Sequence, residues 1–298
     1  MHIPDPMLQG AICPVTLALG AAGLTTAIVA AVRSTAKPNA TRFAGVAALI
    51  FAGQMMNFAI PGGTSGHLLG GVLAAALLGV PFGVLAMTLV LAVQALLFGD
   101  GGMLALGANV CNMALIGVGV GSLFHRRTLG KASQATLLAV GGWLSVMVAA
   151  LAASIEMTVS ANLFFSNVAT AMLGSHLWIG LGEGIITAAA WLALAPALKE
   201  GKSRQALLAP LLIACGAALF LSPLASSLPD GLDKAASQLH LLSDAGSWLA
   251  PLADYRLPGL TSVTLATSLA GLAGTLATFS GGWLLRRSVS DIKGRKAA

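Results

Sequence analysis

The sequence predicts an all-α polytopic membrane protein with about nine transmembrane helices. Hydrophobic residues make up 57% of its 298 residues and charged residues only 9%, whereas soluble domains carry about 25% charged residues. The mean hydropathy of +0.88 leaves too little polar surface to cover a globule in water. Long apolar runs recur along the whole chain, and they place it in the membrane class.

Nine apolar segments follow one another, and about 20 apolar residues are needed to cross the hydrocarbon core. The third segment is short, so we expect a tilted or partial helix packed against protein rather than lipid. The seventh is longer than needed, which favours tilt or an interfacial extension. The predicted spans are 10–32, 43–60, 67–79, 82–98, 103–124, 134–155, 168–197, 206–223 and 262–285.

The loop charges predict the orientation of these spans. With nine alternating spans, 14 of the 16 basic residues fall on one side, and only Lys234 and Arg256 fall on the other. The positive-inside rule makes the basic side cytoplasmic, so the N-terminus is expected outside and the C-terminus in the cytoplasm. The four basic groups are Arg33, Lys37 and Arg42; Arg126, Arg127 and Lys131; Lys199, Lys202 and Arg204; and Arg286, Arg287, Lys293, Arg295 and Lys296.

A boundary is predicted in the basic loop near residue 200. Residues 1–200 would form a seven-span domain, and residues 201–298 a two-span domain with a long outer loop at 224–258. The chain starts without a basic residue before Arg33. We therefore expect no cleavable signal peptide and a retained first residue.

His2 is the most informative single residue. A large second residue disfavours removal of Met1, so the chain is expected to keep a free amine at Met1. The amine, the amide nitrogen of His2 and the His2 imidazole Nδ1 can close two fused chelate rings on one metal ion. Square-planar nitrogen sites favour Ni(II) or Cu(II) over Zn(II). Without a further donor, His2 would be an incidental residue of the tail.

His67 is the predicted fourth donor. It follows the turn-forming sequence Pro61–Gly66, on the same outer side as the N-terminus. Thr64 and Ser65 are expected to supply hydrogen bonds that fix the imidazole. Taken alone, His67 could equally cap a helix or anchor it at the interface.

Other polar residues lie inside apolar sequence. His176 and Glu183 are seven residues apart and share a helix face, and ionisable residues within a span are usually functional. Ion passage, a proton relay and a structural hydrogen bond all remain open for them. Asn57 and Asn109 lie near the outer side and are expected to surround the metal ligands.

Enzymatic motifs are missing from the sequence. It has no GxxxxGK[ST] phosphate loop, no HExxH and no GxSxG. The chain is therefore predicted to be a transport subunit without its own ATPase site, and not an enzyme.

Four ordered motifs carry a family resemblance: Met1–Asp5, Pro61–Gly70, Gln94–Gly102 and Gly107–Met113, followed by Gly182-Glu183-Gly184. The chain resembles the CbiM/NikM family, the substrate-specific components of energy-coupling-factor importers for cobalt and nickel, over about residues 1–200. Residues 201–298 resemble the small companion subunit of the same systems, whose motif P-D-G-L-E reads here with Asp233 in place of Glu.

The resemblance implies a site and partners. It implies a metal held by the Met1 amine, the amide and imidazole nitrogens of His2, and the His67 imidazole. It also implies a transmembrane coupling component and a cytosolic ATPase in the cell (inner) membrane. Ni(II) or Co(II) would be the transported ligand, with no resident cofactor, and a four-nitrogen square favours Ni(II).

Two other functions remain open from the residues themselves. One is a proton-coupled secondary metal transporter with His176 and Glu183 as the relay, although the chain lacks the two matching halves typical of alternating access. The other is a non-transporting scaffold or sensor, which would hold no metal after purification.

Overall fold

The computed structural model describes residues 1–125, 129–200, 204–241 and 250–295. It confirms a mostly helical chain. In these ranges the one sheet is a two-stranded antiparallel hairpin, β1 (Phe58–Ile60) and β2 (Thr64–Gly66), with Phe58 opposite Gly66. The basic residues Arg126, Arg127, Lys202 and Lys296 that enter the orientation argument lie outside the described residues.

Seven helical rods in the described residues are long and apolar enough to cross a membrane. Three of the rods change helix type along their length. They are α1 (Ile12–Arg33); α4 (Val80–Val93) with η2 (Gln94–Phe98); α5 (Leu106–Asn109) with η3 (Val110–Ile116) and α6 (Gly117–Phe124); α7 (Lys131–Ala161); α8 (Phe165–Glu200); α9 (Arg204–Gly216) with η4 (Ala217–Leu221) and η5 (Ser222–Leu224); and α11 (Val263–Arg295).

The second predicted span is shorter than expected, and the third is a partial helix, as its length predicts. Helix α2 (Ala40–Gln54) has 15 residues and α3 (Gly71–Leu78) has 8, so the described chain offers seven full-length spans where the sequence predicts about nine. Residues 55–70 form the hairpin and an extended segment instead of helix. Both helices are buried among the others, and the Gln54 Nε2 atom donates to the Leu69 carbonyl at 2.7 Å. Irregular backbone at membrane depth is tolerated where protein surrounds it.

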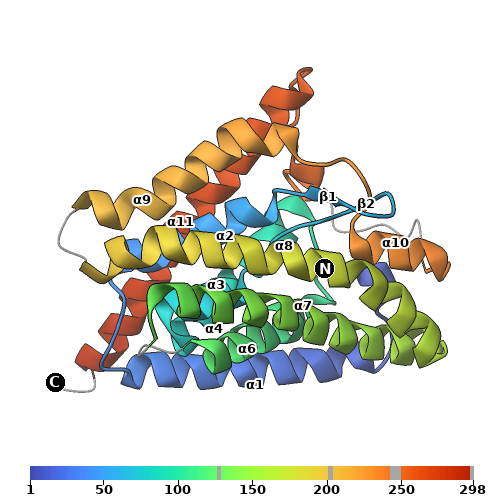
Figure 1. Ribbon diagram of the computed structural model, residues 1–298, viewed down its shortest axis with the longest axis horizontal. Coiled ribbons are helices and arrows are strands. Elements are labelled where there is room, and N and C mark those ends of the chain that lie inside the picture. The colour runs from blue at the N-terminus through green and yellow to red at the C-terminus, as the bar shows by residue number, and fades with distance from the viewer. Residues whose placement is uncertain (126–128, 201–203, 242–249, 296–298) are drawn as a thin grey trace.

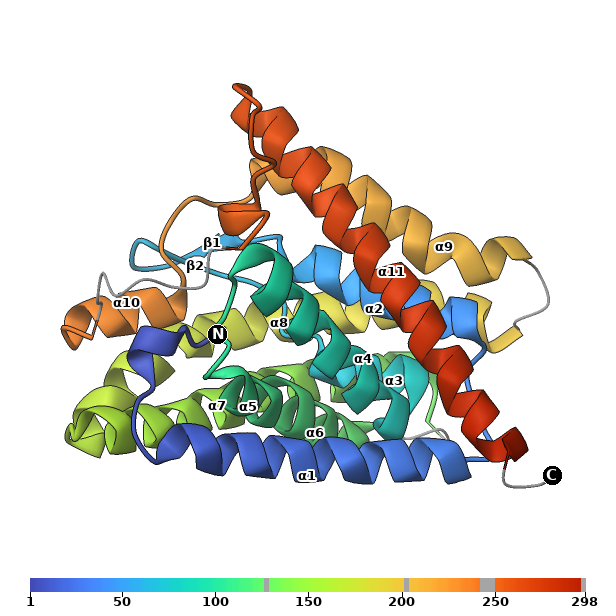
Figure 2. The same ribbon diagram turned by 180° about the vertical axis from the view of Figure 1, so that it is seen from behind.

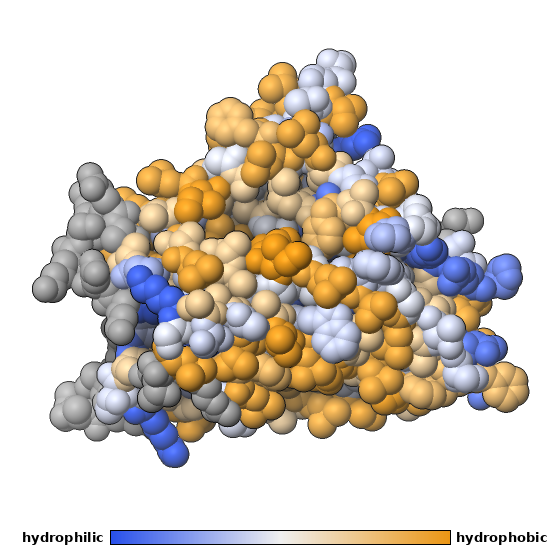
Figure 3. All heavy atoms as spheres, in the orientation of Figure 1, coloured by the Kyte–Doolittle hydropathy of each residue, from blue (hydrophilic) through white to orange (hydrophobic). Residues whose placement is uncertain are grey.

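The outside of the bundle is apolar. Large hydrophobic side chains are exposed along the long helices, for example Leu17 on α1, Ile155 on α7 and Ile185 on α8. In Figure 3 apolar residues cover the middle of the molecule, while polar residues gather toward its two ends. This surface suits a lipid environment, because in water it would be an aggregation liability.

The short elements gather at one end of the bundle (Figures 1 and 2). We call this the hairpin end. It carries the β1–β2 hairpin and α10 (Gly231–Gln238), and the C-terminal end of α11 lies at the opposite end. Parallel bridging of Ser65 with Asp230 joins the hairpin to the start of α10. Two further short elements are η1 (Asp5–Met7) and η6 (Ala253–Tyr255).

Candidate metal centre

The first residues of the chain are inserted into the protein. Only 3% of Met1, 8% of His2 and none of Ile3 is exposed, although chain termini are usually poorly ordered. Asn109 holds Ile3 from both sides: its Oδ1 accepts from the Ile3 amide at 2.8 Å, and its Nδ2 donates to the Ile3 carbonyl at 3.1 Å. This pair of hydrogen bonds fixes the position of the residue that follows His2.

Asp5 anchors the same segment a little further along. Its Oδ1 accepts from the amides of Leu104 and Ala105 at 2.7 and 3.0 Å, and the Gly102 amide donates to the Ile3 carbonyl at 2.9 Å. A Cβ atom on Gly102 would lie 1.8 Å from the Asp5 Oδ1 atom. Only glycine therefore lets the N-terminal segment lie so close to the loop after η2.

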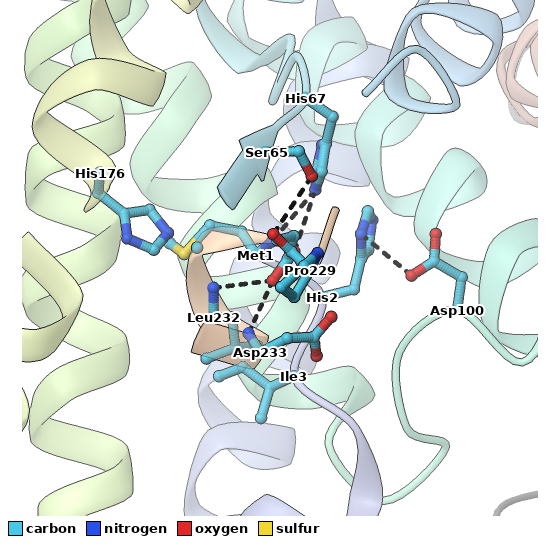
Figure 4. Close-up of polar contacts among 12 residues, drawn as sticks. Met1, His2, Ile3, Ser65, His67, Asp100, His176, Pro229, Leu232 and Asp233 are labelled. Atoms are coloured by element: carbon cyan, nitrogen blue, oxygen red, sulfur yellow. Dashed lines mark hydrogen bonds and ion pairs between the residues drawn. The ribbon is translucent and has the colours of Figure 1, made fainter. Parts of the chain in front are cut away.

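The Met1 amine faces two side chains from distant parts of the chain (Figure 4). Its nitrogen lies 3.1 Å from His67 Nε2 and 3.0 Å from Asp230 Oδ2. The first contact joins the N-terminus to the segment after β2. The second joins it to the residue that precedes α10.

The tautomer of His67 is fixed by its neighbour. His67 Nδ1 lies 2.9 Å from the Leu68 carbonyl, which can only accept, so Nδ1 carries the proton. The lone pair on Nε2 then faces the Met1 amine, as in metal sites where the second ring nitrogen donates to a carbonyl. The carboxyl group of Glu183 supports this segment, because it accepts from the Leu69 and Gly70 amides at 2.5 and 3.0 Å.

The His2 imidazole lies between two polar groups. Its Nε2 is 3.1 Å from Gln94 Oε1, and Gln94 Nε2 donates to the Tyr255 hydroxyl at 3.3 Å. His2 Nε2 is therefore the donor, and the lone pair on Nδ1 points toward Asp100 Oδ1, 3.3 Å away. Burial, more than any other effect, lowers the pKa of His2. A neutral imidazole whose lone pair faces a carboxylate is suited to a cation.

Asp230 is the acidic group of this centre. Burial alone would raise the pKa of its carboxyl, but the positively charged Met1 amine beside it holds that pKa well below the usual range. Asp230 therefore stays ionised. Its negative charge lies next to the Met1 amine nitrogen and His67 Nε2.

These nitrogen atoms could hold a metal ion. Two nitrogens bound at about 2.0–2.1 Å and at right angles on one ion lie about 2.9 Å apart, and Met1 N and His67 Nε2 are 3.1 Å apart. The His2 and His67 rings are nearly parallel, with centroids 5.1 Å apart and an interplanar angle of 18°. In the described residues no three His, Cys, Asp or Glu side chains form a metal-binding group, so the donor set depends on the main-chain nitrogens of the first two residues.

Thr64 and Ser65 were expected to fix the His67 imidazole, but their hydroxyls bond elsewhere. The hydroxyls of Thr64 and Ser65 donate to the Pro229 and Leu228 carbonyls at 2.7 and 2.8 Å, and the Leu68 carbonyl holds the imidazole instead. In the antiparallel hairpin these hydroxyls meet the chain that precedes α10. Asn57 offers its main-chain carbonyl to the Ser226 amide at 2.8 Å.

His176 and Glu183 both come from α8 but have different surroundings. His176 is fully buried, its Nδ1 lies 2.7 Å from the Met172 carbonyl, and its ring lies beside the Met1 side chain in Figure 4. The carboxyl group of Glu183 faces the segment that follows His67. The structure thus brings His176 to the candidate centre and Glu183 to its support.

Three residues that contact the N-terminal segment, and Asp5 within it, were not predicted as site residues. Asp100 and Gln94 stand in the motif Gln94–Gly102, and Asp5 stands in Met1–Asp5, so their motifs carried the signal. Asp230 follows Pro229 and precedes a glycine. That pattern is typical of a helix N-cap, and it points to α10 rather than to Met1.

The fold and the candidate centre define a class: a multi-pass helical membrane protein with a buried cluster of nitrogen donors built on its own N-terminus. Comparison with known families agrees. Residues 2–201 match the model of the CbiM family, described as the cobalt uptake substrate-specific transmembrane region. Residues 204–290 match the PDGLE domain. The chain belongs to the CbiM family, with a PDGLE region fused behind it.

Relatives of known name extend the comparison. A protein of Archaeoglobus fulgidus, provisionally named fused nickel transport protein NikMN, is 38% identical over 296 residues and covers 96% of this chain and 98% of the relative. The cobalt transport protein CbiM of Sorangium cellulosum is 34% identical over 156 residues, 49% of this chain and 68% of that protein.

Two solved structures share the fold of about two thirds of the chain. A structure described as a transition metal transporter is 34% identical, with a TM-score of 0.59, and covers 68% of this chain and 95% of that one. A truncated form has a TM-score of 0.57 and covers 66% of this chain and 99% of that one.

Proposed function

We propose that this chain is the substrate-binding subunit of an energy-coupling-factor importer that takes up Ni(II), or Co(II), in an ATP-driven process. The observation that carries the proposal is the buried Met1 amine, whose nitrogen lies 3.1 Å from His67 Nε2, the imidazole nitrogen that carries no proton. Chain termini are usually poorly ordered, whereas this one is buried and has His67 and Asp230 as partners. Relatives named as nickel and cobalt transport proteins support the choice of cargo.

The proposed ligands are four nitrogens in one plane. They are the Met1 amine, the His2 amide nitrogen, His2 Nδ1 and His67 Nε2. The Irving–Williams order places Ni(II) above Co(II), and square-planar nitrogen geometry suits Ni(II) better than tetrahedral Zn(II). We therefore favour nickel. Asn109 and Asp5 would hold the N-terminal segment in place, and Gln94 would orient the His2 ring.

We further propose nine membrane crossings, with the hairpin end outside and the C-terminus in the cytoplasm. Besides the seven long helices, α2 would make one short crossing, and the segment from β2 through α3 would make the other. Charge supports this orientation, since Arg42 and Arg286 bond to main-chain carbonyls of Leu198 and Pro38, far from the hairpin end.

Two domains follow from this topology. Residues 1–200 would form the seven-crossing metal-binding domain, and residues 201–298 the two-crossing companion domain with an outer loop at 224–258. Residues 201–203 and 242–249, which include the boundary and part of that loop, lie outside the described residues.

The energy for import must then come from other subunits. We propose a transmembrane coupling component and a cytosolic ATPase as partners, because the sequence has no phosphate-binding loop. A proton-coupled transporter would use His176 and Glu183 as a relay. The contacts of Glu183 with two main-chain amides favour a supporting role instead.

The test is the metal content and electronic spectrum of the purified, untagged protein, followed by uptake in vesicles with and without ATP and the two partners. We expect one Ni(II) per chain with the spectrum of a planar diamagnetic centre, and uptake that needs ATP. A paramagnetic Co(II) signal would replace nickel by cobalt. Uptake driven by a proton gradient alone, or no bound metal at all, would overturn the proposal.

A further inference from the structure

Asp230 belongs to the PDGLE region, yet it contacts the candidate centre of the CbiM region directly. Its Oδ1 accepts from the Leu232 and Asp233 amides, both at 2.8 Å, and so caps α10. Its Oδ2 lies 3.0 Å from the Met1 nitrogen and 3.9 Å from His67 Nε2. One carboxylate thus joins a helix start to the amine that the proposed function requires.

The main chain around Asp230 is fixed to the same hairpin that leads to His67. The Ser65 amide donates to the Pro229 carbonyl at 2.9 Å, and the Ser65 hydroxyl donates to Leu228. The Thr64 hydroxyl also donates to Pro229. Asp230 and His67 are therefore held in register with one another, and a side chain locked by such support positions what it contacts.

A second residue of the PDGLE region, Tyr255, contacts the two side chains that lie beside His2. The Tyr255 hydroxyl donates to Asp100 and accepts from Gln94, and both of these contact His2. The Tyr255 ring stacks on Phe98 with centroids 4.6 Å apart. The nearby Leu252 amide donates to the Leu97 carbonyl at 2.8 Å, so Tyr255 is held against the end of η2.

From these two contacts we infer that Asp230 and Tyr255 are positioning residues of the metal site, Asp230 for the Met1 amine and Tyr255 for the His2 imidazole. The inference rests on the proposed function. A free N-terminus has many conformations, and holding it in the binding geometry before the metal arrives strengthens binding by preorganisation. The PDGLE region would then build one wall of the metal site.

The test compares untagged variants that keep the surrounding structure. Asp230→Asn preserves a good N-cap for α10 but removes the charge that faces the amine. Tyr255→Phe keeps the ring on Phe98 and removes only the hydroxyl. Asp233→Asn is the matched control, because it removes the same charge three residues later from an exposed side chain.

Two quantities are measured with Ni(II) alone as the probe: the rate of metal release to a chelator, and the d–d absorption band. We expect Asp230→Asn and Tyr255→Phe to release Ni(II) about 10–100-fold faster, the usual cost of losing a partner behind a ligand, and Asp233→Asn less than about twofold faster. The band should move to longer wavelength in the first two variants, because part of the sites lose a nitrogen ligand. A purely structural effect would lower the amount of bound metal without moving the band.

The inference is overturned when Asp230→Asn and Tyr255→Phe release Ni(II) as slowly as Asp233→Asn, with the band of the unchanged protein. In that result the unchanged protein still binds metal, so the proposed function stands. An unchanged protein that binds neither Ni(II) nor Co(II) overturns both. If Asp230→Asn does not fold, Tyr255→Phe alone decides the outcome.

Discussion

The Met1 amine nitrogen lies 3.1 Å from His67 Nε2, although 66 residues separate the two in the sequence. Neither residue could form this contact through local structure. The N-terminal segment must be inserted beside the hairpin end, where Asn109 and Asp5 hold it, while the β1–β2 hairpin presents His67. We therefore expect that substitutions on either side of this contact weaken metal binding.

His67→Ala removes one of the four proposed nitrogen ligands. Loss of a residue that only hydrogen-bonds to a metal ligand lowers metal affinity roughly 10–100-fold. Because His67 is a proposed ligand itself, we expect the affinity for Ni(II) to fall by more than this. Isothermal titration of the purified, untagged protein measures it. His240→Ala is the control, since His240 is exposed. Equal affinities of the two variants would remove His67 from the site.

Asn109→Ala deletes both hydrogen bonds to Ile3. The buried Ile3 amide then lacks its partner, and the segment that carries His2 is less well fixed. We expect Ni(II) affinity to fall about 10–100-fold, with the protein still folded. Asn57→Ala is the comparison, because in the described structure no hydrogen bond of its side chain is seen. A fall of the same size in both variants would contradict the role given to Asn109.

Gly102→Ala tests how closely the N-terminal segment lies against the loop after η2. The new Cβ would lie 1.8 Å from Asp5 Oδ1 and 2.3 Å from the Asp5 amide nitrogen, so the N-terminal segment must move and metal binding should be lost. Gly174→Ala, in α8 with no atom within 4 Å of the new Cβ, should bind as before. Protein carrying Gly102→Ala that retains full Ni(II) affinity would show that the insertion is not needed.

Glu183→Gln separates a supporting role from a proton relay. The substitution weakens the bonds to the Leu69 and Gly70 amides, and hydrogen bonds to charged groups contribute about 1.5–3 kcal/mol each. We expect a lower melting temperature and weaker Ni(II) binding together. Thermal unfolding and titration measure both. Uptake that fails while stability and binding are unchanged would favour the relay.

Most of the fold could be predicted from the sequence because apolar runs report directly on helices that cross a membrane. The second span was the exception, because residues 55–60 leave the helix and enter the β1–β2 hairpin. The short third segment was expected to be a partial helix packed against protein, and α3, with 8 mostly buried residues, has that form.

The candidate centre could be predicted only in part. His2 stands out because its chelating power depends on its place in the chain, and His67 because a histidine follows a glycine-rich turn. Asp230 and Tyr255 reach the centre only in the folded chain, so no local sequence pattern connects them to it. Asp230 lies 229 residues after Met1. Thr64 and Ser65 were expected to face the imidazole. Their hydroxyls instead donate to the chain that precedes α10, and a short stretch of sequence does not show which distant segment a hairpin contacts.

The most direct measurement is the Ni(II) stoichiometry of the untagged protein against one that carries a single additional residue before Met1. The extra residue moves the free amine away from His67 Nε2 and turns the Met1 nitrogen into an amide. We expect about one Ni(II) per chain in the untagged protein and none in the extended one. Equal stoichiometry and affinity in the two proteins would contradict a site built on the N-terminus.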